Sequence, residues 1–383
     1  MKLSESWVTN PATQTVCAVL IDAGFQALFV GGCVRNALLG APVSDLDIAT
    51  DAPPQQVLDL MRAAGLKAIP TGIEHGTITV VSQSIPHEIT TFRRDVETDG
   101  RRAVVAFSDN VDEDASRRDF TMNALYARPD GTLLDPLNGL PDLKARKVRF
   151  IGNAQHRIRE DYLRSLRYFR FHAWYGDVEA GFDPEALSAI STNLDGLAGL
   201  SRERVGAEFM KLLTAPDPAP SVAAMRSTGV LAQILPGVED RSLAPLIALE
   251  QQAGAKPEPV RRLSSIATPE IAQTLRLSKA QIQRLTRMRD EAAGTAGTAE
   301  LGFRYGEEDG LHEVLLRCAL LEQPWSEDKR QALRDGAAAD FPVRAADLIP
   351  DFTGPALGKK LAELEARWIA SGFTLTRTEL LVE

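Results

Sequence analysis

Two aspartates separated by one residue, Asp45 and Asp47, have a spacing that could support catalysis. The segment Ser44 to Ala49 alternates polar and apolar residues as a β-strand does, so both carboxylates should point to one face. Such a pair can bind hard cations such as Mg²⁺, as two-metal phosphoryl transfer requires. The alternative is a solvent-facing strand edge. Glu88, on a later predicted strand, is a possible third metal ligand or an ordinary surface residue.

A glycine pair, Gly31 and Gly32, stands between a predicted strand, Ala27 to Val30, and a predicted helix, Val34 to Leu39. Backbone N–H groups that no side chain covers can face a phosphate at such a place. A glycine pair at a strand end is more commonly a plain turn. Arg35, on the first turn of the helix, and the two aspartates that follow favour phosphate binding here.

Three charged residues further along, Arg157, Asp161 and Arg164, would share one face of a helix. Glu160, four residues before Arg164, could hold its guanidinium in place. A carboxylate acceptor beside a guanidinium donor matches the edge of cytosine or adenine, which offers an amino donor next to a ring-nitrogen acceptor, and mismatches guanine and uracil. The alternative is a salt-bridged helix face exposed to solvent.

The charge of the chain is unevenly distributed along the sequence. Its 383 residues carry a net charge of -9, which argues against a surface coated in basic residues. The stretch from Lys144 to Arg170 nevertheless holds nine Lys and Arg against two acids, a net charge of +7. This stretch suits a triphosphate or an RNA backbone, and a charge-laced helix surface is the alternative.

The three cysteines, Cys17, Cys33 and Cys318, are widely spaced and form no CxxC pair, so we expect a reducing, cytoplasmic location. No run of about 18 apolar residues predicts a membrane span. The first residues, Met1 to Pro11, lack the features of a secretory signal.

The pattern of elements predicts an α+β fold, with a mixed or antiparallel sheet and helices first and an almost wholly helical remainder. At 383 residues and 44% hydrophobic residues, the chain should form two or three ordered domains. Thr214 to Pro220, rich in proline, is the best candidate for an internal linker. We expect three parts, a mixed α/β part over 1–150 and helical parts over 151–215 and 216–383, for which the family resemblance given next implies catalysis, nucleotide selection and tRNA binding, in that order.

Four motifs in order resemble those of the class II nucleotidyltransferases, the tRNA CCA-adding enzymes and bacterial poly(A) polymerases of the polymerase β superfamily. They are Phe29 to Arg35 with Ser44 to Asp47, Arg117 to Ala124, Asp135-Pro136 with Gly139 and Asp142-Leu143, and Glu160 to Arg164. The resemblance is close over about residues 25 to 175 and loose beyond. Asn36 departs from the family, which commonly has Asp there.

The resemblance implies a polymerase-β-like head followed by a helical neck, body and tail. It implies that Asp45 and Asp47 bind two Mg²⁺ ions, that Glu160 and Asp119 orient their neighbours, and that CTP, ATP and tRNA are the substrates. The implied nucleotide-binding residues are Gly31, Gly32, Arg35, Arg117, Arg118, Asn123, Asp161, Arg164 and Arg167.

Within the family, Thr71 to Thr77 and a charged loop at about residues 94 to 116 are similar to CCA-adding enzymes, in which a flexible loop here helps the switch from C to A. We therefore expect full CCA addition. A poly(A) polymerase or a CC-adding enzyme would share every catalytic residue named. An inactive RNA-binding homologue is the alternative from another class; Asn36 hints at it, and the intact Asp45 and Asp47 argue against it. The sequence indicates no oligomeric state.

Overall fold

A mixed sheet near the amino terminus and a series of helices after it make up the computed structural model, which describes residues 1–98 and 103–382. The chain divides into two compact units, Met1–Pro236 and Gly237–Glu383. The predicted linker, Thr214 to Pro220, lies inside the first unit. After it, α11 (Ala219–Ser227) packs back against α8 (Leu163–Tyr175). The domain boundaries that we predicted at residues 150 and 215 stay predictions.

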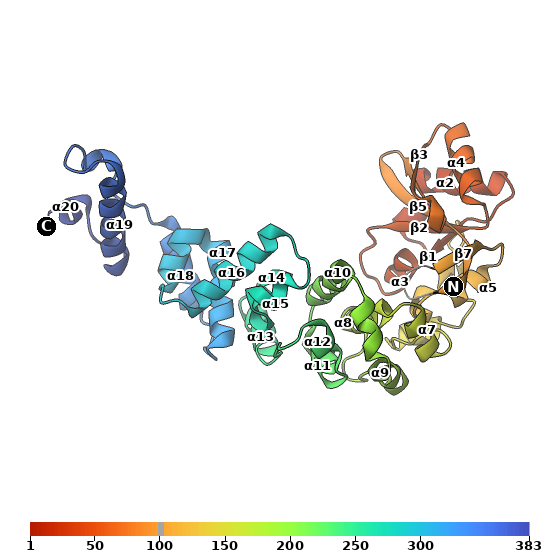
Figure 1. The fold of residues 1–383 in the computed structure, drawn as a ribbon. Coiled ribbons are helices and arrows are strands. Elements are labelled where there is room, and N and C mark those ends of the chain that lie inside the picture. Colours follow the sequence, from red (N-terminus) through yellow and green to blue (C-terminus); the bar gives the residue numbers. More distant parts are fainter. Residues whose placement is uncertain (99–102, 383) are drawn as a thin grey trace. The chain divides into compact units, whose positions relative to one another are not determined.

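Within the described residues, seven strands form one sheet in the order β3-β4-β5-β2-β1-β8-β9 (Figure 1). Strand β2 pairs with β5 in parallel and the other pairs are antiparallel, which confirms the predicted mixed sheet. The strands are β1 (Leu28–Val30), β2 (Leu46–Thr50), β3 (Lys67–Gly72), β4 (Thr77–Ser82), β5 (Ile85–Thr91), β8 (Tyr126–Ala127) and β9 (Leu133–Leu134).

Two helices, α2 (Pro11–Asp22) and α4 (Pro54–Ala63), pack on each other and on strands β4 and β5 (Figure 1). Asn10 caps α2, because its side-chain oxygen accepts a hydrogen bond from the Ala12 backbone N–H at 2.9 Å. The apolar face of α2, which includes Val16 and Leu20, is fully buried. The short helices α1 (Ser6–Thr9), α3 (Gly32–Leu38) and α6 (Leu140–Lys144) belong to the same unit.

We predicted a loop at about residues 94 to 116, and this prediction is wrong for the described part of the segment. It contains a separate two-stranded sheet, β6 (Arg93–Thr98) with β7 (Ala103–Phe107), followed by α5 (Val111–Ser116). The β-branched Val104 and Val105 favour an extended backbone, and pairing with β6 satisfies its hydrogen-bonding groups. Asp99 to Arg102, which the prediction included, lie outside the described residues.

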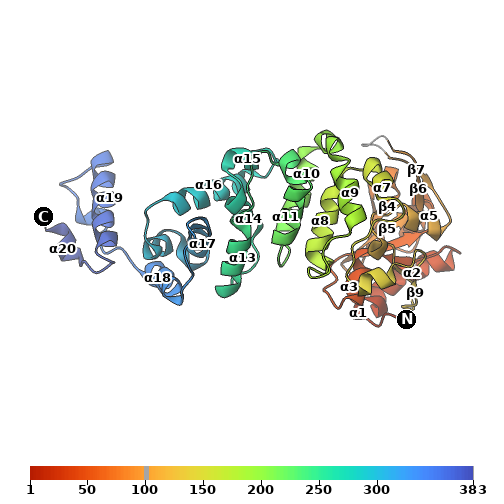
Figure 2. The ribbon, with the colours of Figure 1, turned by 90° about the horizontal axis from the view of Figure 1, so that it is seen from below.

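Helices complete the first unit after the sheet. They are α7 (Ala154–Glu160), α8, α9 (Pro184–Ser191), α10 (Arg202–Leu213), α11 and α12 (Val230–Ile234), and α8 packs against both α10 and α11 (Figure 2). Buried aromatic rings join this part to the sheet. The ring of Phe120 lies 5.0 Å from the rings of Phe150 and Phe171, and Phe150 stacks on Tyr168 at 5.5 Å.

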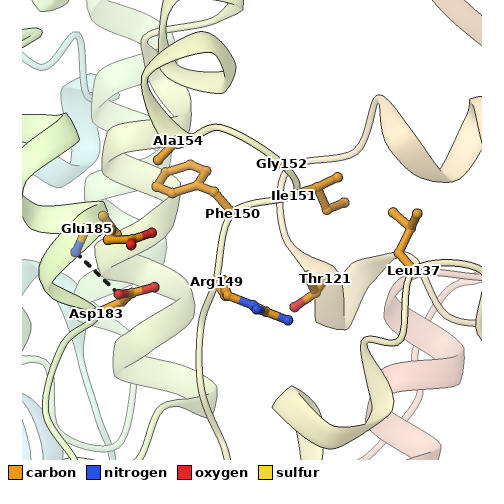
Figure 3. A pocket seen from close by; sticks show the side chains of 10 residues that line it. Thr121, Leu137, Arg149, Phe150, Ile151, Gly152, Ala154, Asp183 and Glu185 are labelled. Carbon is orange, nitrogen blue, oxygen red and sulfur yellow. Dashed lines mark hydrogen bonds between the residues drawn. The ribbon is translucent and has the colours of Figure 1, made fainter.

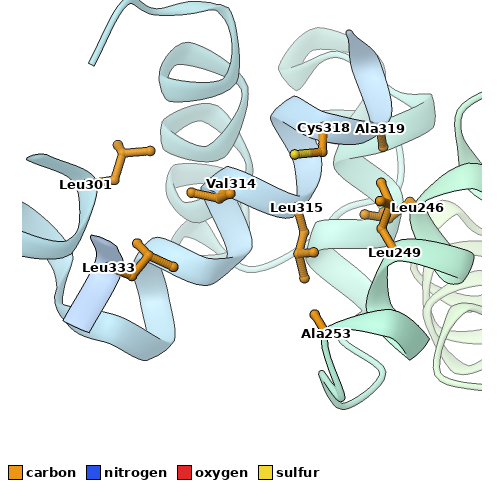
Figure 4. Close-up of a cluster of buried hydrophobic side chains, with 9 residues drawn as sticks. All are labelled: Leu246, Leu249, Ala253, Leu301, Val314, Leu315, Cys318, Ala319 and Leu333. Atoms are coloured by element: carbon orange, nitrogen blue, oxygen red, sulfur yellow. The ribbon is translucent and has the colours of Figure 1, made fainter. Parts of the chain in front are cut away.

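The second unit consists of helices throughout its described residues, as predicted. They are α13 (Leu243–Gln252), α14 (Pro259–Ile266), α15 (Pro269–Gln273), α16 (Lys279–Ala293), α17 (Thr298–Leu320), α18 (Glu327–Ala338), α19 (Gly354–Ala370) and α20 (Arg377–Leu381). Leucine, valine and alanine side chains from α13, α17 and α18 form one core (Figure 4), and a second core surrounds Trp368 of α19. No helix in the described part of the chain has the length and apolar character that a membrane span needs.

Beside the first of these cores, one buried carboxylate holds two buried guanidinium groups. Glu250 lies 2.7 Å from Arg261 through one oxygen and 2.7 Å from Arg262 through the other. All three side chains are at most 2% exposed. Removing one member of such a cluster leaves a buried charge without its partner, which costs far more than the cluster itself contributes.

We therefore predict that Glu250→Gln lowers the free energy of unfolding by about 3–5 kcal/mol, because it removes the buried carboxylate that both arginines share. Urea unfolding of the full chain, followed by circular dichroism, would measure it. Glu239→Gln is the matched control, because Glu239 and its partner Arg241 are 71% and 82% exposed, and it should change stability little. Equal effects of the two substitutions would contradict the prediction.

Candidate active site

The two predicted catalytic carboxylates lie at the start of β2. Asp45 immediately precedes the strand and is exposed, with the Ser44 hydroxyl donating to it at 2.9 Å. Asp47 is half-buried, and its carboxylate has no hydrogen-bond or ion-pair partner among the described residues. The parallel pairing of β2 with β5 places Glu88 directly opposite Asp47.

Burial raises the pKa of Asp47 to about 6, and the nearby negative charges of Glu88 and Asp45 add to this effect. A half-buried carboxylate without a partner, crowded by other carboxylates, fits a bound hard cation. Among the described residues, however, no group of three or more His, Cys, Asp or Glu side chains could hold a metal ion by itself. Glu88 as a third ligand stays a prediction.

The glycine pair forms the turn between β1 and α3. Gly31 has φ +70° and ψ -120°, a conformation that only glycine adopts easily. A Cβ atom at Gly31 would lie 3.5 Å from Nη1 of Arg118, so the absent side chain leaves this guanidinium room to lie against the turn. The predicted phosphate-binding turn and a predicted phosphate-binding arginine are therefore neighbours.

Arg117 and Arg118 are both held by one buried carboxylate, that of Asp114. Its Oδ1 accepts from Arg117 at 2.6 Å, and its Oδ2 accepts from Arg118 at 3.0 Å and from the Tyr126 hydroxyl at 2.7 Å. Burial alone would raise the pKa of Asp114, but the two arginines lower this pKa to about 2. Asp114 and Tyr126 were not predicted. Because Asp114 lies three and four residues before the arginines, helical spacing could have indicated it.

Asp119 and Asn123 connect the turn to helix α8. Asp119 accepts from the Asn123 side chain at 2.9 Å and from Arg167 at 2.5 Å. Burial alone would raise the pKa of Asp119, but the ion pair with Arg167 keeps this pKa below its ordinary value. Asn123 in turn accepts from Arg35 at 2.6 Å, and Tyr175 accepts from Arg35 at 2.8 Å. Asp119 thus contacts Asn123 and Arg167, both predicted nucleotide-binding residues, and its orienting role stays a prediction.

The predicted single helix through Arg157, Asp161 and Arg164 is wrong. Helix α7 ends at Glu160, Asp161 is extended (φ -153°, ψ 105°), and α8 begins at Leu163. The Asp161 side chain accepts from the Leu163 backbone N–H at 3.1 Å, the kind of local bond by which aspartate favours a break between helices.

Both predicted base-reading groups are nevertheless held in place. Arg164 forms an ion pair with Glu160, as predicted, and donates to the backbone carbonyls of Arg157 and Arg117, each at 3.0 Å. Asp161 pairs with Arg204 of α10 at 2.7 Å. Arg204, like Tyr175, comes from an element remote in sequence, so no local pattern could have indicated either.

The predicted basic patch is mostly paired with acids. Six of its nine basic residues form ion pairs, and their acidic partners include four outside the stretch. The paired basic residues are Lys147, Arg149, Arg157, Arg164, Arg167 and Arg170, and the outside acids are Asp119, Asp142, Asp183 and Glu208. The net charge counted along the sequence therefore exceeds the charge available to a ligand.

A cavity of about 320 Å³ lies between the segment at residues 149–154 and the start of α9 (Figure 3). Arg149, Phe150, Asp183 and Glu185 contribute to its lining, and none of the predicted site residues does. We assign it no part in the predicted chemistry.

Two family models match the chain: "Poly A polymerase head domain" over residues 27–149 and "Probable RNA and SrmB- binding site of polymerase A" over residues 181–241. The human mitochondrial CCA tRNA nucleotidyltransferase 1 is 32% identical over 399 residues, covering 96% of this chain and 88% of the relative. A CCA-adding enzyme of Lactobacillus delbrueckii subsp. bulgaricus is 38% identical, covering 66% of this chain and 63% of the relative.

Solved structures are similar over nearly the whole chain. The Bacillus stearothermophilus CCA-adding enzyme in complex with CTP has a TM-score of 0.77 at 28% identity, with 97% of this chain and 95% of that chain covered. The Thermotoga maritima CCA-adding enzyme complexed with tRNA has a TM-score of 0.71 at 17% identity, with 100% and 97% covered, and this likeness concerns the fold.

We predict that Asp114→Asn lowers the free energy of unfolding by about 2 kcal/mol near neutral pH, the amount that corresponds to a pKa lowered from 3.8 to about 2. A depressed pKa contributes stability above the unfolded-state value. That contribution is lost as the pH falls from about 4 to about 2. Urea midpoints measured from neutral pH downward should therefore converge for the two proteins.

Asp59→Asn provides the control, because Asp59 is an exposed carboxylate of α4 that bonds only to Gln55. It should leave the urea midpoint nearly unchanged at every pH. A destabilisation by Asp114→Asn that stays constant down to the acid limit of the fold would argue against the assigned ion pairs.

Proposed function

The chain belongs to the class II tRNA nucleotidyltransferase family of CCA-adding enzymes, and we propose that it adds C, C and A to tRNA 3′ ends from CTP and ATP. One observation carries the residue assignment. Asp47, a carboxylate without a partner, and the Gly31–Gly32 turn lie on neighbouring strands of the unit that also holds the pair Asp161 and Arg164. This arrangement supports the proposal that one unit holds both the reacting phosphate and the base-reading group.

Asp45 and Asp47 are proposed to hold two Mg²⁺ ions. The crowding of carboxylates around Asp47, with its raised pKa, supports a cation at this position. When bound, such ions lower the pKa of an attacking hydroxyl and stabilise the leaving pyrophosphate. Glu88 lies on the same face and adds negative charge beside Asp47, whether or not it ligates.

The triphosphate is proposed to lie on the Gly31–Gly32 turn. Arg118 supports this placement, since Asp114 and Tyr126 hold its Nε and Nη2 while Nη1 lies against Gly31. Arg35 and Asn123 lie beside the same turn, and Arg117 shares the carboxylate of Asp114 with Arg118. Positive charge fixed in advance stabilises a phosphoryl group without reorganisation during the reaction.

Base selection is proposed for Asp161 and Arg164, with Arg167 beside them. Other protein groups hold the Asp161 carboxylate and the Arg164 guanidinium in place. The hydrogen-bond acceptor and the hydrogen-bond donor therefore keep their positions relative to each other. Cytosine and adenine satisfy both groups, whereas guanine and uracil would place donor against donor and acceptor against acceptor. Because the two accepted bases share this edge, one site can serve both substrates.

The helical parts of the chain are proposed to bind tRNA by its shape and phosphates, as is typical of double-stranded RNA recognition. The match to a probable RNA-binding family model over residues 181–241 supports this. An inactive RNA-binding homologue is disfavoured, because both Asp45 and Asp47 are present at the start of β2. The cytoplasmic location, suggested by the cysteines, stays a prediction.

Asp45→Asn and Asp47→Asn should each reduce nucleotide addition by about 10³-fold or more, since each removes a charged metal ligand of a phosphoryl-transfer site. The assay supplies CTP and ATP, separately and together, to a tRNA transcript lacking its last three nucleotides and sequences the 3′ ends. Binding of tRNA should persist. The exposed control Asp59→Asn should stay active, and a wild-type product other than CCA would refute the proposed function.

Asp161→Asn should relax base selection, because an amide can present either a donor or an acceptor to the base. We expect discrimination against UTP to fall by about 10-fold or more, within the roughly 1–3 kcal/mol that a base mismatch costs. Single-nucleotide additions with each of the four triphosphates would measure the change. Asp195→Asn, an exposed aspartate of the same unit, serves as control. Unchanged discrimination in Asp161→Asn would remove this residue from base selection.

A further inference from the structure

Arg35 is a buried cation whose hydrogen-bond partners in the described chain are all neutral. Only 7% of the residue is exposed. Its Nη1 donates to the Asn123 side-chain oxygen at 2.6 Å, and its Nη2 donates to the Tyr175 hydroxyl at 2.8 Å. Its Nε and Nη2 both donate to the side-chain oxygen of Asn36, at 3.1 and 2.9 Å.

Asp119 and Asp47 act on Arg35 through their charge but form no ion pair with it in the described chain, and two aromatic rings lie against it. Its guanidinium carbon lies 4.0 Å from the centre of the Tyr175 ring and 5.1 Å from that of Phe171. The nearest link to a carboxylate runs through Asn123 to Asp119, which is itself paired with Arg167. Burial in these surroundings lowers the pKa of Arg35 from its ordinary value, although the group remains charged.

The other arginines of this region differ from Arg35 in this respect. Arg117 and Arg118 pair with Asp114, Arg167 pairs with Asp119, and Arg170 pairs with a glutamate of α10. A buried cation without a counter-charge is costly unless an anion compensates it. Nη2 of Arg35 would lie 3.9 Å from a Cβ atom at Gly32, so its charge lies directly beside the turn.

Asn36 is the partner that decides whether this charge is compensated. Its side-chain nitrogen donates to the Pro42 backbone carbonyl at 2.9 Å, which fixes the orientation of the amide and points its oxygen at Arg35. An aspartate has the same shape. It would accept the same two bonds from Arg35, but with a negative charge, and it could not donate to Pro42.

We propose that Asn36 is an affinity-determining residue that keeps Arg35 without a counter-charge inside the protein, so that the triphosphate of the incoming nucleotide supplies it. This rests on the proposed function. The triphosphate is common to CTP and ATP, so the effect of Asn36 should be equal for both and independent of Asp161 and Arg164. Asn36 acts through Arg35 and is a positioning residue, not a catalytic one.

The test is Asn36→Asp in the full chain, with inorganic tripolyphosphate as the probe at a fixed Mg²⁺ concentration. We expect tripolyphosphate to bind about 3- to 10-fold more weakly, since a charge-assisted pair is roughly twice as strong as a neutral one. The KM values for CTP and ATP should rise by the same factor. The difference from wild type should largely persist as salt is added, because Arg35, one member of the new charge pair, is buried and salt screens such a pair much less than an exposed one.

Asn10→Asp is the matched control. It makes the same isosteric change and adds the same charge in the same unit, at a helix N-cap where aspartate and asparagine serve equally well. It should leave tripolyphosphate binding and both KM values unchanged.

Two results would overturn the inference. They are unchanged tripolyphosphate binding in Asn36→Asp, and a fall in kcat alone, which would place the effect at the Pro42 contact. Failure of the proposed function is distinguishable from these, because the wild-type chain would then bind tripolyphosphate but add no nucleotide to tRNA.

Discussion

The buried carboxylate of Asp119 is the interaction on which the arrangement of the catalytic unit depends. One oxygen accepts from Asn123, which in turn accepts from Arg35 beneath the glycine turn, and the other accepts from Arg167 of α8. A single buried charge thus connects the phosphate side of the site to α8, the helix that carries Arg164. Loss of Arg167 would leave the Asp119 charge without its ion-pair partner in the interior, so this connection is held by a large penalty for breaking it.

The same constraint explains how positive charge is distributed. Lys144 to Arg170 is strongly basic along the sequence, but acids from other segments neutralise most of it, since long basic side chains in an interior need counter-charges. Arg118 and Arg35 remain beside the glycine turn, the first with Nη1 directed at it and the second without a carboxylate in contact. The charge useful to a polyanionic ligand is therefore concentrated at one place and not spread over a patch.

Most local features could be predicted because they follow from neighbouring residues. The strand–glycine–helix order around Gly31, the alternation at Asp45 and Asp47, and the pairing of Glu160 with Arg164 all involve residues a few positions apart. Two local predictions were wrong where competing local interactions prevailed. Asp161 interrupts the expected helix by accepting from Leu163, and the expected charged loop pairs as β6 and β7, because side-chain capping and strand pairing satisfy backbone groups that periodicity ignores.

By itself, then, the sequence determined the fold class and the family and predicted the catalytic carboxylates, because each depends on residue types at short, fixed spacings. Only the tertiary structure decided which partner each charge has. Tyr175 against Arg35, Arg204 against Asp161 and Glu250 between Arg261 and Arg262 are contacts that the folded chain creates. The physical reason is that buried charges must be compensated in three dimensions, and the compensating group can come from any segment that packing brings within about 3 Å.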